Sequence, residues 1–347
     1  FGRQLSDWEG VIPPKMAVEA LDELRGGAPS VTGFEAYAKC PSGFFFKHLL
    51  GLDDLDEPAE AASPNALEIG SALHRALESF MEPYITASPA TLPPDDEKSQ
   101  AVLEGLIRAE FDALNSTQNY IHPGEVRRAT DHLVTRMKTW LTRLDRSGDW
   151  APYALEMAFG TRHKASTHDA YRLAWDGGHC DVRGEIDRVD VRTVDGVTEY
   201  RIMDYKSSKR YPKVSAKRTR EAMEADFVGG TLLQFGAYAL AVEQVLGHPV
   251  TVTGYDYVTP GKGNSMVVTI PWNADLADKM KRVLENLMES MRAGLFARGT
   301  DCIFCRPKGI CGTTLQKGRA PDDPLWDRYR AATGTPIASD DEMEGAK

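Results

Sequence analysis

Two alternating segments joined by an Asp-Gly dipeptide restrict the fold of this chain more than any other feature. Residues 184–190 and 201–206 both alternate apolar and polar side chains, and Asp195-Gly196 lies between them. Asp-Gly between alternating segments is the sequence typical of a two-residue type I′ hairpin. Such a turn pairs positions at equal distances from it, so Asp187 is predicted opposite Asp204, with Glu185 and Lys206 as the next pair on the same face.

Two carboxylates directly across a strand pair need a reason to be there. Their Cβ atoms would lie about 5 Å apart, where like charges are destabilising. At an effective dielectric near 20 the repulsion is about 3 kcal/mol. A hard divalent cation such as Mg²⁺, which binds carboxylate oxygens, would turn this cost into binding energy. The alternative is a surface hairpin with solvated acids, and a β-bulge would remove the pairing.

The pattern along the rest of the chain predicts a helical first half followed by a sheet with further helices. Helical spacing covers 68–82, 98–115 and 125–146; strand alternation covers 153–159, 171–175, 180–191, 197–205, 251–258 and 266–270; and helices are expected at 231–246 and 274–297. We also expect a helix that begins at Ser30, passes Cys40 and runs towards Gly51, with Glu35 helping to cap it. Together these patterns predict an α/β protein with a mixed sheet.

Length and composition fit a soluble protein with a sizeable core. The chain has 347 residues, of which 42% are hydrophobic and 27% charged. Since no apolar run approaches the roughly 18 residues of a membrane span, we expect no membrane partner and a cytoplasmic location. Residues 1–30 are predicted to be an irregular linker, and Phe1 in place of Met suggests a piece of a longer protein.

Several motifs occur in an order that resembles the PD-(D/E)XK nucleases of the RecB type. They are Gly70-x-x-x-His74, Gly-x-Ile-Asp-Arg-x-Asp at 184–190, Asp204-x-Lys206 and Gln234-x-x-x-Tyr238. The resemblance implies a restriction-endonuclease-like core with Mg²⁺ or Mn²⁺ bound by His74, Asp187, Asp204 and the Tyr205 carbonyl. It also implies that Lys206 is the catalytic lysine, that Glu156 is a further acidic member, and that Gln234 and Tyr238 contact DNA. Simple packing of the last two on one helical face is the alternative.

Four of the five cysteines form a second pattern. Cys302-x-x-Cys305-x₅-Cys311 is a tight thiolate cluster one ligand short of four, and spacing alone does not choose between zinc and an iron–sulfur cluster. With the isolated Cys40, the pattern resembles the iron–sulfur nucleases of the AddB kind. That resemblance implies a 4Fe–4S cluster that joins the two ends of the domain as a structural staple. Cys180 is expected to be a buried small hydrophobe.

The charge of the chain is segregated. The formal net charge is −10, yet seven basic residues and no acidic one lie between Lys206 and Arg220. We expect this stretch, with Lys209, Arg210, Lys217 and Arg218, to contact the phosphate backbone of DNA together with the Arg-rich helix at 125–146. The alternative is a solvated loop and helix face.

These features lead to one functional hypothesis and three alternatives. The main one is an iron–sulfur nuclease domain at 31–320 of a bacterial helicase–nuclease that degrades single-stranded DNA or DNA ends during double-strand break resection and repair. It would consist of a helical part at 31–150, a catalytic core at 151–297 and a cysteine cluster at 300–315, followed by a disordered acidic tail at 321–347. No Gly-x-x-x-x-Gly-Lys-Ser/Thr motif is present, so any helicase motor must lie elsewhere in the protein or in a partner subunit. The alternatives are a standalone nuclease of the RecB-like or CRISPR-adaptation type, a catalytically silent DNA-binding scaffold, and a generic zinc-binding interaction module.

Overall fold

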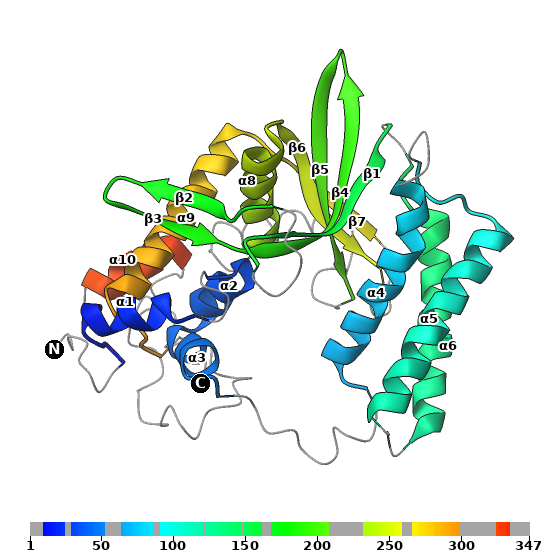
Figure 1. The fold of residues 1–347 in the computed structure, drawn as a ribbon, viewed down its shortest axis with the longest axis horizontal. Helices are drawn as coiled ribbons and strands as arrows, with labels where there is room; N and C mark the ends of the chain where they lie inside the picture. The colour runs from blue at the N-terminus through cyan, green and yellow to red at the C-terminus, as the bar shows by residue number, and fades with distance from the viewer. Residues whose placement is uncertain are drawn as a thin grey trace, which may run out of the picture.

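A five-stranded mixed sheet organises the protein. We describe a computed structural model. Its strands are β1 (Ala151–Phe159), β4 (Gly184–Val194), β5 (Val197–Lys206), β6 (Val250–Tyr257) and β7 (Met266–Pro271), in the spatial order β1-β4-β5-β6-β7 (Figure 1). β5 and β6 run parallel, and the other neighbouring pairs are antiparallel. A separate two-stranded ribbon is formed by β2 (Tyr171–Trp175) and β3 (Gly178–Val182). The expected mixed sheet is therefore confirmed.

The structure describes most but not all of the chain. The described residues are 10–24, 29–52, 64–85, 91–118, 120, 122–146, 149–161, 168–207, 232–258, 266–298 and 324–333. Among them, no helix is both long and apolar enough to cross a membrane. The predictions that concern Lys209, Arg210, Lys217, Arg218, Cys302, Cys305 and Cys311 lie outside these residues, as does the final stretch 334–347.

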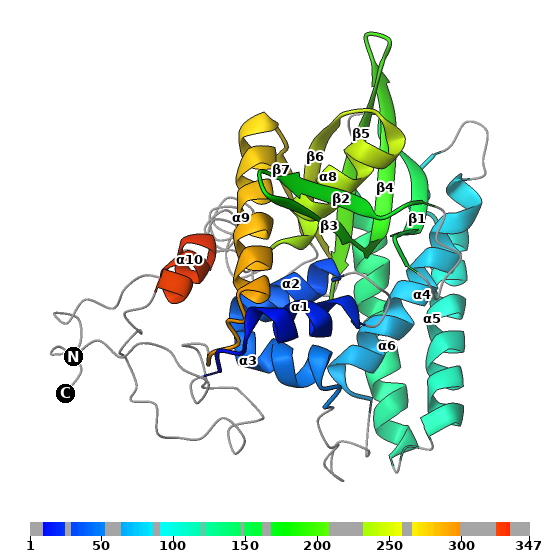
Figure 2. The ribbon, with the colours of Figure 1, turned by 60° about the vertical axis from the view of Figure 1, so that its left-hand side comes forward.

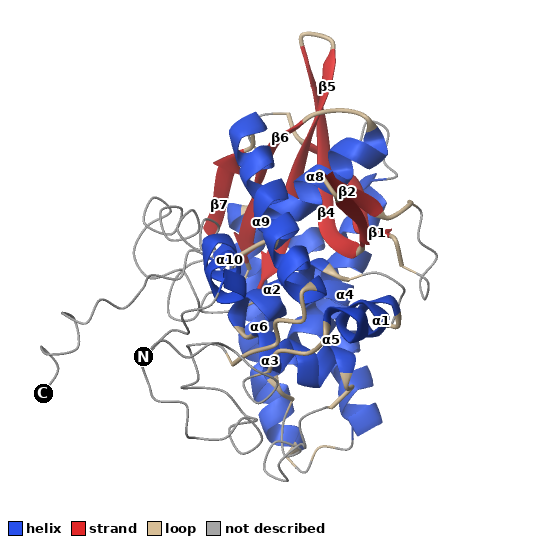
Figure 3. Cartoon of the chain, turned by 90° about the vertical axis from the view of Figure 1, so that its left-hand side faces the viewer, coloured by secondary structure: helices blue, strands red, loops and turns tan. Residues whose placement is uncertain are grey.

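Helices cover the sheet from two sides (Figures 1 and 2). One side carries α4 (Ala66–Ile85), α5 (Glu97–Gln118) and α6 (Pro123–Arg143), which share an apolar cluster with Tyr205 of β5 and with Val258, the residue after β6. On the other side, the main core forms around α8 (Gln234–Leu246) and α9 (Ala274–Arg292). The same core contains residues of α1 (Pro14–Asp22), α2 (Val31–Lys39) and α10 (Pro324–Thr333), and Figure 3 shows α1 and α2 below the strands.

The predicted β4–β5 register is confirmed along most of the hairpin. Pairs run from Val194–Val197 beside the turn to Arg188–Met203. Asp195 and Gly196 both have positive φ, at 50° and 80°, as a type I′ turn requires. The ladder stops one step before Asp187 and Asp204, and here the Tyr205 amide donates to Asp187 Oδ2 at 2.6 Å instead. The two carboxylates therefore lie at the open end of the hairpin rather than within the ladder.

Two segments that are predicted to lack structure contain helices. α1 lies inside the expected linker and buries Ala17 and Leu21. The Pro13-Pro14 pair suggests a break in the sequence, but proline at the first helical position starts a helix. α10 lies inside the expected disordered tail, where Trp326 and Tyr329 are buried and the Tyr329 hydroxyl donates to the Ala38 carbonyl at 2.6 Å. Two buried aromatic rings explain why this short segment folds.

The expected helix through Cys40 is interrupted, and the expected strand 180–191 is divided. α2 ends at Lys39, since Cys40 is extended and precedes Pro41; a short α3 (Pro41–Phe44) and a π-helix (Phe45–Leu49) follow. The strand is divided at Arg183 into β3 and β4. Ser30 caps α2 by accepting from the Gly33 amide at 3.0 Å, as expected. The Glu35 carboxylate does not help: it contacts the start of α8 instead.

Candidate active site

Three of the predicted site residues converge from three separate elements. His74 of α4 lies with its Nδ1 3.5 Å from Asp187 Oδ1 on β4 and 3.8 Å from Glu156 Oε1 on β1. One ligand atom from each of the three lies within 4.8 Å of the others, a spacing that could hold a metal ion. The imidazole reaches the two carboxylates because α4 packs against β1.

Glu156 reaches this cluster through an unusual backbone. Its φ is +44°, in the left-handed region that non-glycine residues rarely adopt within a strand. It lies between the ladder pairs Leu155–Arg188 and Met157–Ile186, which places it across from Asp187. Such backbone strain persists where surrounding structure enforces it, often at functional sites.

Asp204 and Lys206 complete the site from β5. The Lys206 ammonium lies 2.5 Å from Asp204 Oδ2 and 4.8 Å from the centre of the Tyr255 ring. It also donates to Gln234 Oε1 at 2.7 Å. Apart from the lysine, Asp204 Oδ2 is buried without a hydrogen-bond partner among the residues that the structure describes. A buried carboxylate oxygen with spare acceptor capacity is a suitable ligand for a cation.

The pKa shifts in this cluster reflect an excess of negatively charged groups. Burial alone would lower the pKa of His74, but Asp187 and Glu156 raise it to about 10. Burial raises the pKa of Asp204 to about 7, with the Asp187 charge adding to the effect and Lys206 opposing it. Burial also raises the pKa of Glu156, while His74 opposes that change. The site would therefore stabilise an added positive charge, whether a proton or a metal ion carries it.

The donor set fits a hard divalent cation. Carboxylate oxygens are the ligands that Mg²⁺ and Mn²⁺ prefer, and one imidazole is compatible with Mn²⁺. His74, Glu156 and Asp187 supply three such groups, and Asp204 Oδ2, which lies against the Lys206 ammonium, is a fourth acidic oxygen nearby. Such a cation, next to the Lys206 ammonium, could bind and polarise a phosphate ester.

A comparison with known families agrees with this geometry. The sequence matches the family described as the PD-(D/E)XK nuclease superfamily over residues 28–312, which is well over half of the chain. The chain belongs to the PD-(D/E)XK nuclease superfamily. Membership implies a nuclease that cleaves phosphodiester bonds, and it fits the five-stranded mixed sheet with flanking helices.

Curated relatives of this chain are much longer proteins. Each is named as a subunit of an ATP-dependent helicase/deoxyribonuclease. The protein from Clostridium kluyveri is 27% identical over 67% of this chain and 18% of its own length. The Geobacillus kaustophilus protein is 26% identical over 80% of this chain and 24% of its own length. The Desulforudis audaxviator protein is 30% identical over 57% of this chain and 17% of its own length. The chain thus spans about a quarter or less of the length of these relatives.

Among solved structures, the crystal structure of SSO0001 aligns over 76% of this chain and 90% of that chain. The sequence identity is 11% and the TM-score 0.27. This likeness is too weak to carry an argument about the nuclease fold.

The two residues of the Gln234-x-x-x-Tyr238 motif lie in different environments. Gln234 is half-buried and binds Lys206. Tyr238 is only 3% exposed, with its ring 6.1 Å from Phe159, and an added Cβ at Gly184 would meet that ring at 2.8 Å. The Tyr238 ring is therefore packed in the core, and the DNA contacts of Gln234 and Tyr238 stay predictions.

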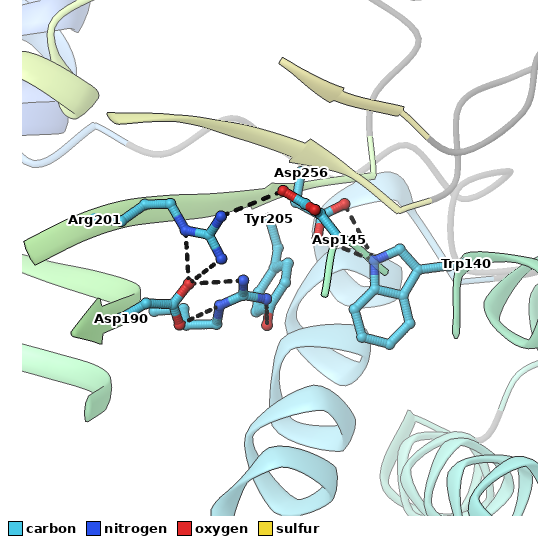
Figure 4. A network of polar contacts seen from close by, with 7 residues as sticks. Trp140, Asp145, Asp190, Arg201, Tyr205 and Asp256 are labelled. Atoms are coloured by element: carbon cyan, nitrogen blue, oxygen red, sulfur yellow. Dashed lines mark hydrogen bonds and ion pairs between the residues drawn. The ribbon is translucent and has the colours of Figure 1, made fainter. Parts of the chain in front are cut away.

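A buried charge network, shown in Figure 4, lies behind the candidate site, on the face of β4 opposite to Asp187. Asp190 accepts two hydrogen bonds from Arg188 and two from Arg201, all between 2.7 and 2.9 Å. Arg188 also donates to the Tyr205 hydroxyl at 3.2 Å. Because the Tyr205 amide holds Asp187, this network supports the strand end that carries the carboxylates.

A second contact ties the same face to the helical layer. Trp140 of α6 donates its indole N–H to both oxygens of Asp256, at 3.1 and 3.0 Å. Asp256 lies beside Tyr205 in the parallel β5–β6 pair, and Figure 4 shows it next to the arginine network. Sequence reasoning missed this contact and the network. Strand alternation was the available signal for the network, since Arg188 and Asp190 must face away from Asp187.

The two described cysteines behave differently. Cys180 is 7% exposed in the core, as expected. Cys40 is half-buried and free, and its Sγ accepts from the Gly43 amide at 3.4 Å. Its neighbour Ser42 donates its amide to the Ala297 carbonyl at 3.1 Å. Cys40 therefore lies beside the last described residues before the C-terminal cysteines.

Proposed function

We propose that this chain is a Mg²⁺- or Mn²⁺-dependent deoxyribonuclease whose reaction centre contains His74, Glu156, Asp187, Asp204 and Lys206. The observation that supports this most is the convergence of His74, Glu156 and Asp187 within 4.8 Å. His74, Asp187, Asp204 and the Tyr205 carbonyl would hold the cation, with Glu156 as a further acid. A cation bound there supplies Lewis acidity and lowers the pKa of bound water.

The residues themselves account for positioning and charge. Lys206 is held between Asp204 and Gln234, so its ammonium is oriented before substrate arrives. From there it can stabilise the charge that develops on the phosphoryl oxygens or orient the attacking water. The network behind β5 keeps Asp187 and Tyr205 in register while a charged substrate binds.

The substrate we propose is single-stranded DNA, cut exonucleolytically from an end. The curated relatives are named as helicase/deoxyribonuclease subunits, which supports DNA as substrate. We propose that the chain serves as the nuclease part of such a helicase–nuclease, working with a motor in double-strand break resection and repair. A standalone nuclease is the second candidate, because the chain matches a quarter or less of each relative named above.

The test is degradation of end-labelled single-stranded DNA with Mg²⁺ by the intact chain and by Lys206→Ala. Loss of this ammonium should lower the cleavage rate by about 10²- to 10³-fold, the usual cost of one lost charge-stabilising group. Circular single-stranded DNA serves as the substrate control, because an exonuclease leaves it intact.

The outcomes separate the candidates. Equal cleavage by the wild type and by Lys206→Ala would place the activity elsewhere or in a contaminant. DNA binding without cleavage by either protein would favour the scaffold alternative or a need for the motor. Rapid cleavage by the isolated chain would favour the standalone nuclease.

We also propose that Cys40, Cys302, Cys305 and Cys311 bind a 4Fe–4S cluster that links the two ends of the domain. The spacing of the last three and the position of Cys40 beside Ala297 support this. The segment from Arg298 to Cys302 is four residues long and spans at most about 14 Å. Within the described residues, the Cys40 sulfur already accepts one amide hydrogen bond, as cluster thiolates commonly do.

Metal analysis of anaerobically purified protein tests the cluster. We expect iron and acid-labile sulfide in equal amounts, close to four of each per chain for a 4Fe–4S cluster. Cys40→Ser should lose most of both. Stoichiometric zinc without iron or sulfide would overturn the assignment in favour of a zinc site.

A further inference from the structure

Helix α8 begins without a capping side chain of its own. Its N-cap residue is Leu233, which has no side-chain acceptor. The acceptor comes from α2 instead: Glu35 Oε1 accepts from the Leu233 amide at 2.7 Å and from the Gln234 amide at 3.2 Å. Glu35 is 9% exposed, so this carboxylate is withdrawn from water and placed against the positive end of a helix.

The residue fixed by this cap is the one that binds the lysine of the nuclease site. The Gln234 backbone amide donates to the Glu35 carboxylate, and the Gln234 side-chain Oε1 accepts from Lys206 Nζ at 2.7 Å. A lysine side chain has four flexible bonds, so its ammonium, which Asp204 also contacts at 2.5 Å, needs the Gln234 oxygen as a second fixed acceptor to set its position. A shift of the first turn of α8 would move that acceptor.

Glu35 itself is placed on a well-anchored helix. At the start of α2, the Val31 amide donates to the Arg183 carbonyl, and the Arg183 amide donates to the Pro29 carbonyl, both at 3.1 Å. Further along, the Tyr37 hydroxyl donates to the Leu295 carbonyl at 2.6 Å. Arg183 directly precedes β4, so α2 is fixed to the strand that carries Asp187.

We propose that Glu35 is a positioning residue for Lys206, acting through the start of α8 and the side chain of Gln234. The proposal rests on the proposed function for the catalytic meaning of Lys206. The contact chain itself does not depend on that function. A purely structural cap would stabilise α8 without affecting the lysine, so the two roles predict different results.

The first readout is independent of nuclease activity. A brief pulse of acetic anhydride, followed by mass spectrometry, measures how readily the Lys206 amine is acetylated. Glu35→Ala and Gln234→Ala should each raise the labelling of Lys206 several-fold, and the double variant should show no further increase. Glu35→Gln keeps the accepting oxygen and should stay within about twofold of the wild type.

The second readout is the single-turnover rate of DNA cleavage. Glu35→Ala should lower this rate by about 10- to 100-fold, the scale of a displaced reacting group, while Mn²⁺ affinity stays unchanged. If Glu35→Ala does not fold, Glu35→Asp keeps the charge but withdraws the acceptor by one methylene, and should show a smaller change in the same direction.

Asn273→Ala is the matched control, because Asn273 caps α9 by accepting from the Leu276 amide at 3.0 Å and lies on a different helix. It should lower stability without changing Lys206 labelling. The proposal is overturned if Glu35→Ala behaves like Asn273→Ala, or if the effects of Glu35→Ala and Gln234→Ala on labelling simply add. Absence of cleavage by the wild type would contradict the proposed function alone, since labelling would still decide the role of Glu35.

Discussion

At Glu156, the backbone of β1 adopts a left-handed conformation that places a buried carboxylate next to Asp187 and His74. The conformation costs about 1–2 kcal/mol for a residue with a Cβ. Burial and the charge of Asp187 add a second cost, which the raised pKa of Glu156 reflects. Binding of a cation by this carboxylate would offset both costs.

A comparison of Glu156→Asn with Glu156→Gln isolates the cost of the left-handed backbone. Both remove the charge, but asparagine adopts the left-handed region more readily than glutamine. With a chelator present to remove metal, we expect the free energy of unfolding of Glu156→Asn to exceed that of Glu156→Gln by about 1 kcal/mol, as measured by chemical denaturation. Both should bind Mn²⁺ more weakly than the wild type. Equal stability of the two variants would contradict the strain at this position.

Among single residues, short-range patterns located several candidates but not their partners. Asp204 and Lys206 lie two apart on one strand, and the Asp-Gly turn placed them near Asp187. The contact from Glu35 to α8 spans 198 residues and has no periodic signature. Glu35 was instead expected to cap its own helix, because a capping-box pattern is purely local.

Among the elements, β4 has different tasks on its two faces. Asp187 faces the candidate metal site, while Arg188 and Asp190 on the other face belong to the buried charge network. Asp190 is fully buried and balances two guanidinium groups, so the end of β5 is held by ionic contacts rather than by apolar packing alone.

Replacing Asp190 should therefore be costly, whereas replacing Asp145 should not. Asp190→Asn leaves two buried arginines without a full counter-charge, which we expect to lower the free energy of unfolding by about 3–5 kcal/mol. Asp145 contacts the same Arg201 at 3.4 Å but is 39% exposed, so Asp145→Asn should cost about 0–1 kcal/mol. Chemical denaturation measures both, and similar losses would show that the network is not what stabilises β5.

Periodicity predicted the central strands well because one face of each is apolar and the turn chemistry is local. It failed at α1 and α10, where the decisive contacts are distant: α1 packs on α9, and Tyr329 of α10 binds the Ala38 carbonyl of α2. The strand break at Arg183 follows from backbone bonds to residues 29 and 31, which no local pattern could reveal.

Across the whole molecule, several basic residues of the helical layer are occupied by internal contacts. Lys138 binds Glu104 at 2.5 Å, Arg108 binds Asp131 at 2.8 Å, and Arg146 donates to three backbone carbonyls. Arg127, Arg128 and Arg143 of the Arg-rich helix at 125–146 are exposed, so its contact with DNA stays a prediction. The basic stretch after Lys206 remains the main prediction for the phosphate backbone.

Charge reversal at Lys217 and Arg218 tests that stretch. Replacing both with glutamate should weaken binding of single-stranded DNA and reduce the slope of log affinity against log salt by about 1–2. Lys15→Glu with Lys281→Glu, two exposed sites, changes the net charge equally and serves as the control. An unchanged affinity and salt slope in the Lys217 and Arg218 variant would show that this stretch does not contact DNA.

The proposed nuclease depends above all on one divalent-metal centre formed by residues of α4, β1, β4 and β5. Titration of Mn²⁺, followed by the EPR signal of the free ion, tests it directly in the wild type, Asp187→Asn and Lys206→Ala. We expect Asp187→Asn to bind Mn²⁺ at least about tenfold more weakly. Lys206→Ala, which removes a positive charge beside the site, should bind at least as tightly as the wild type. Wild-type affinity in Asp187→Asn, with its fold intact, would contradict the existence of this centre.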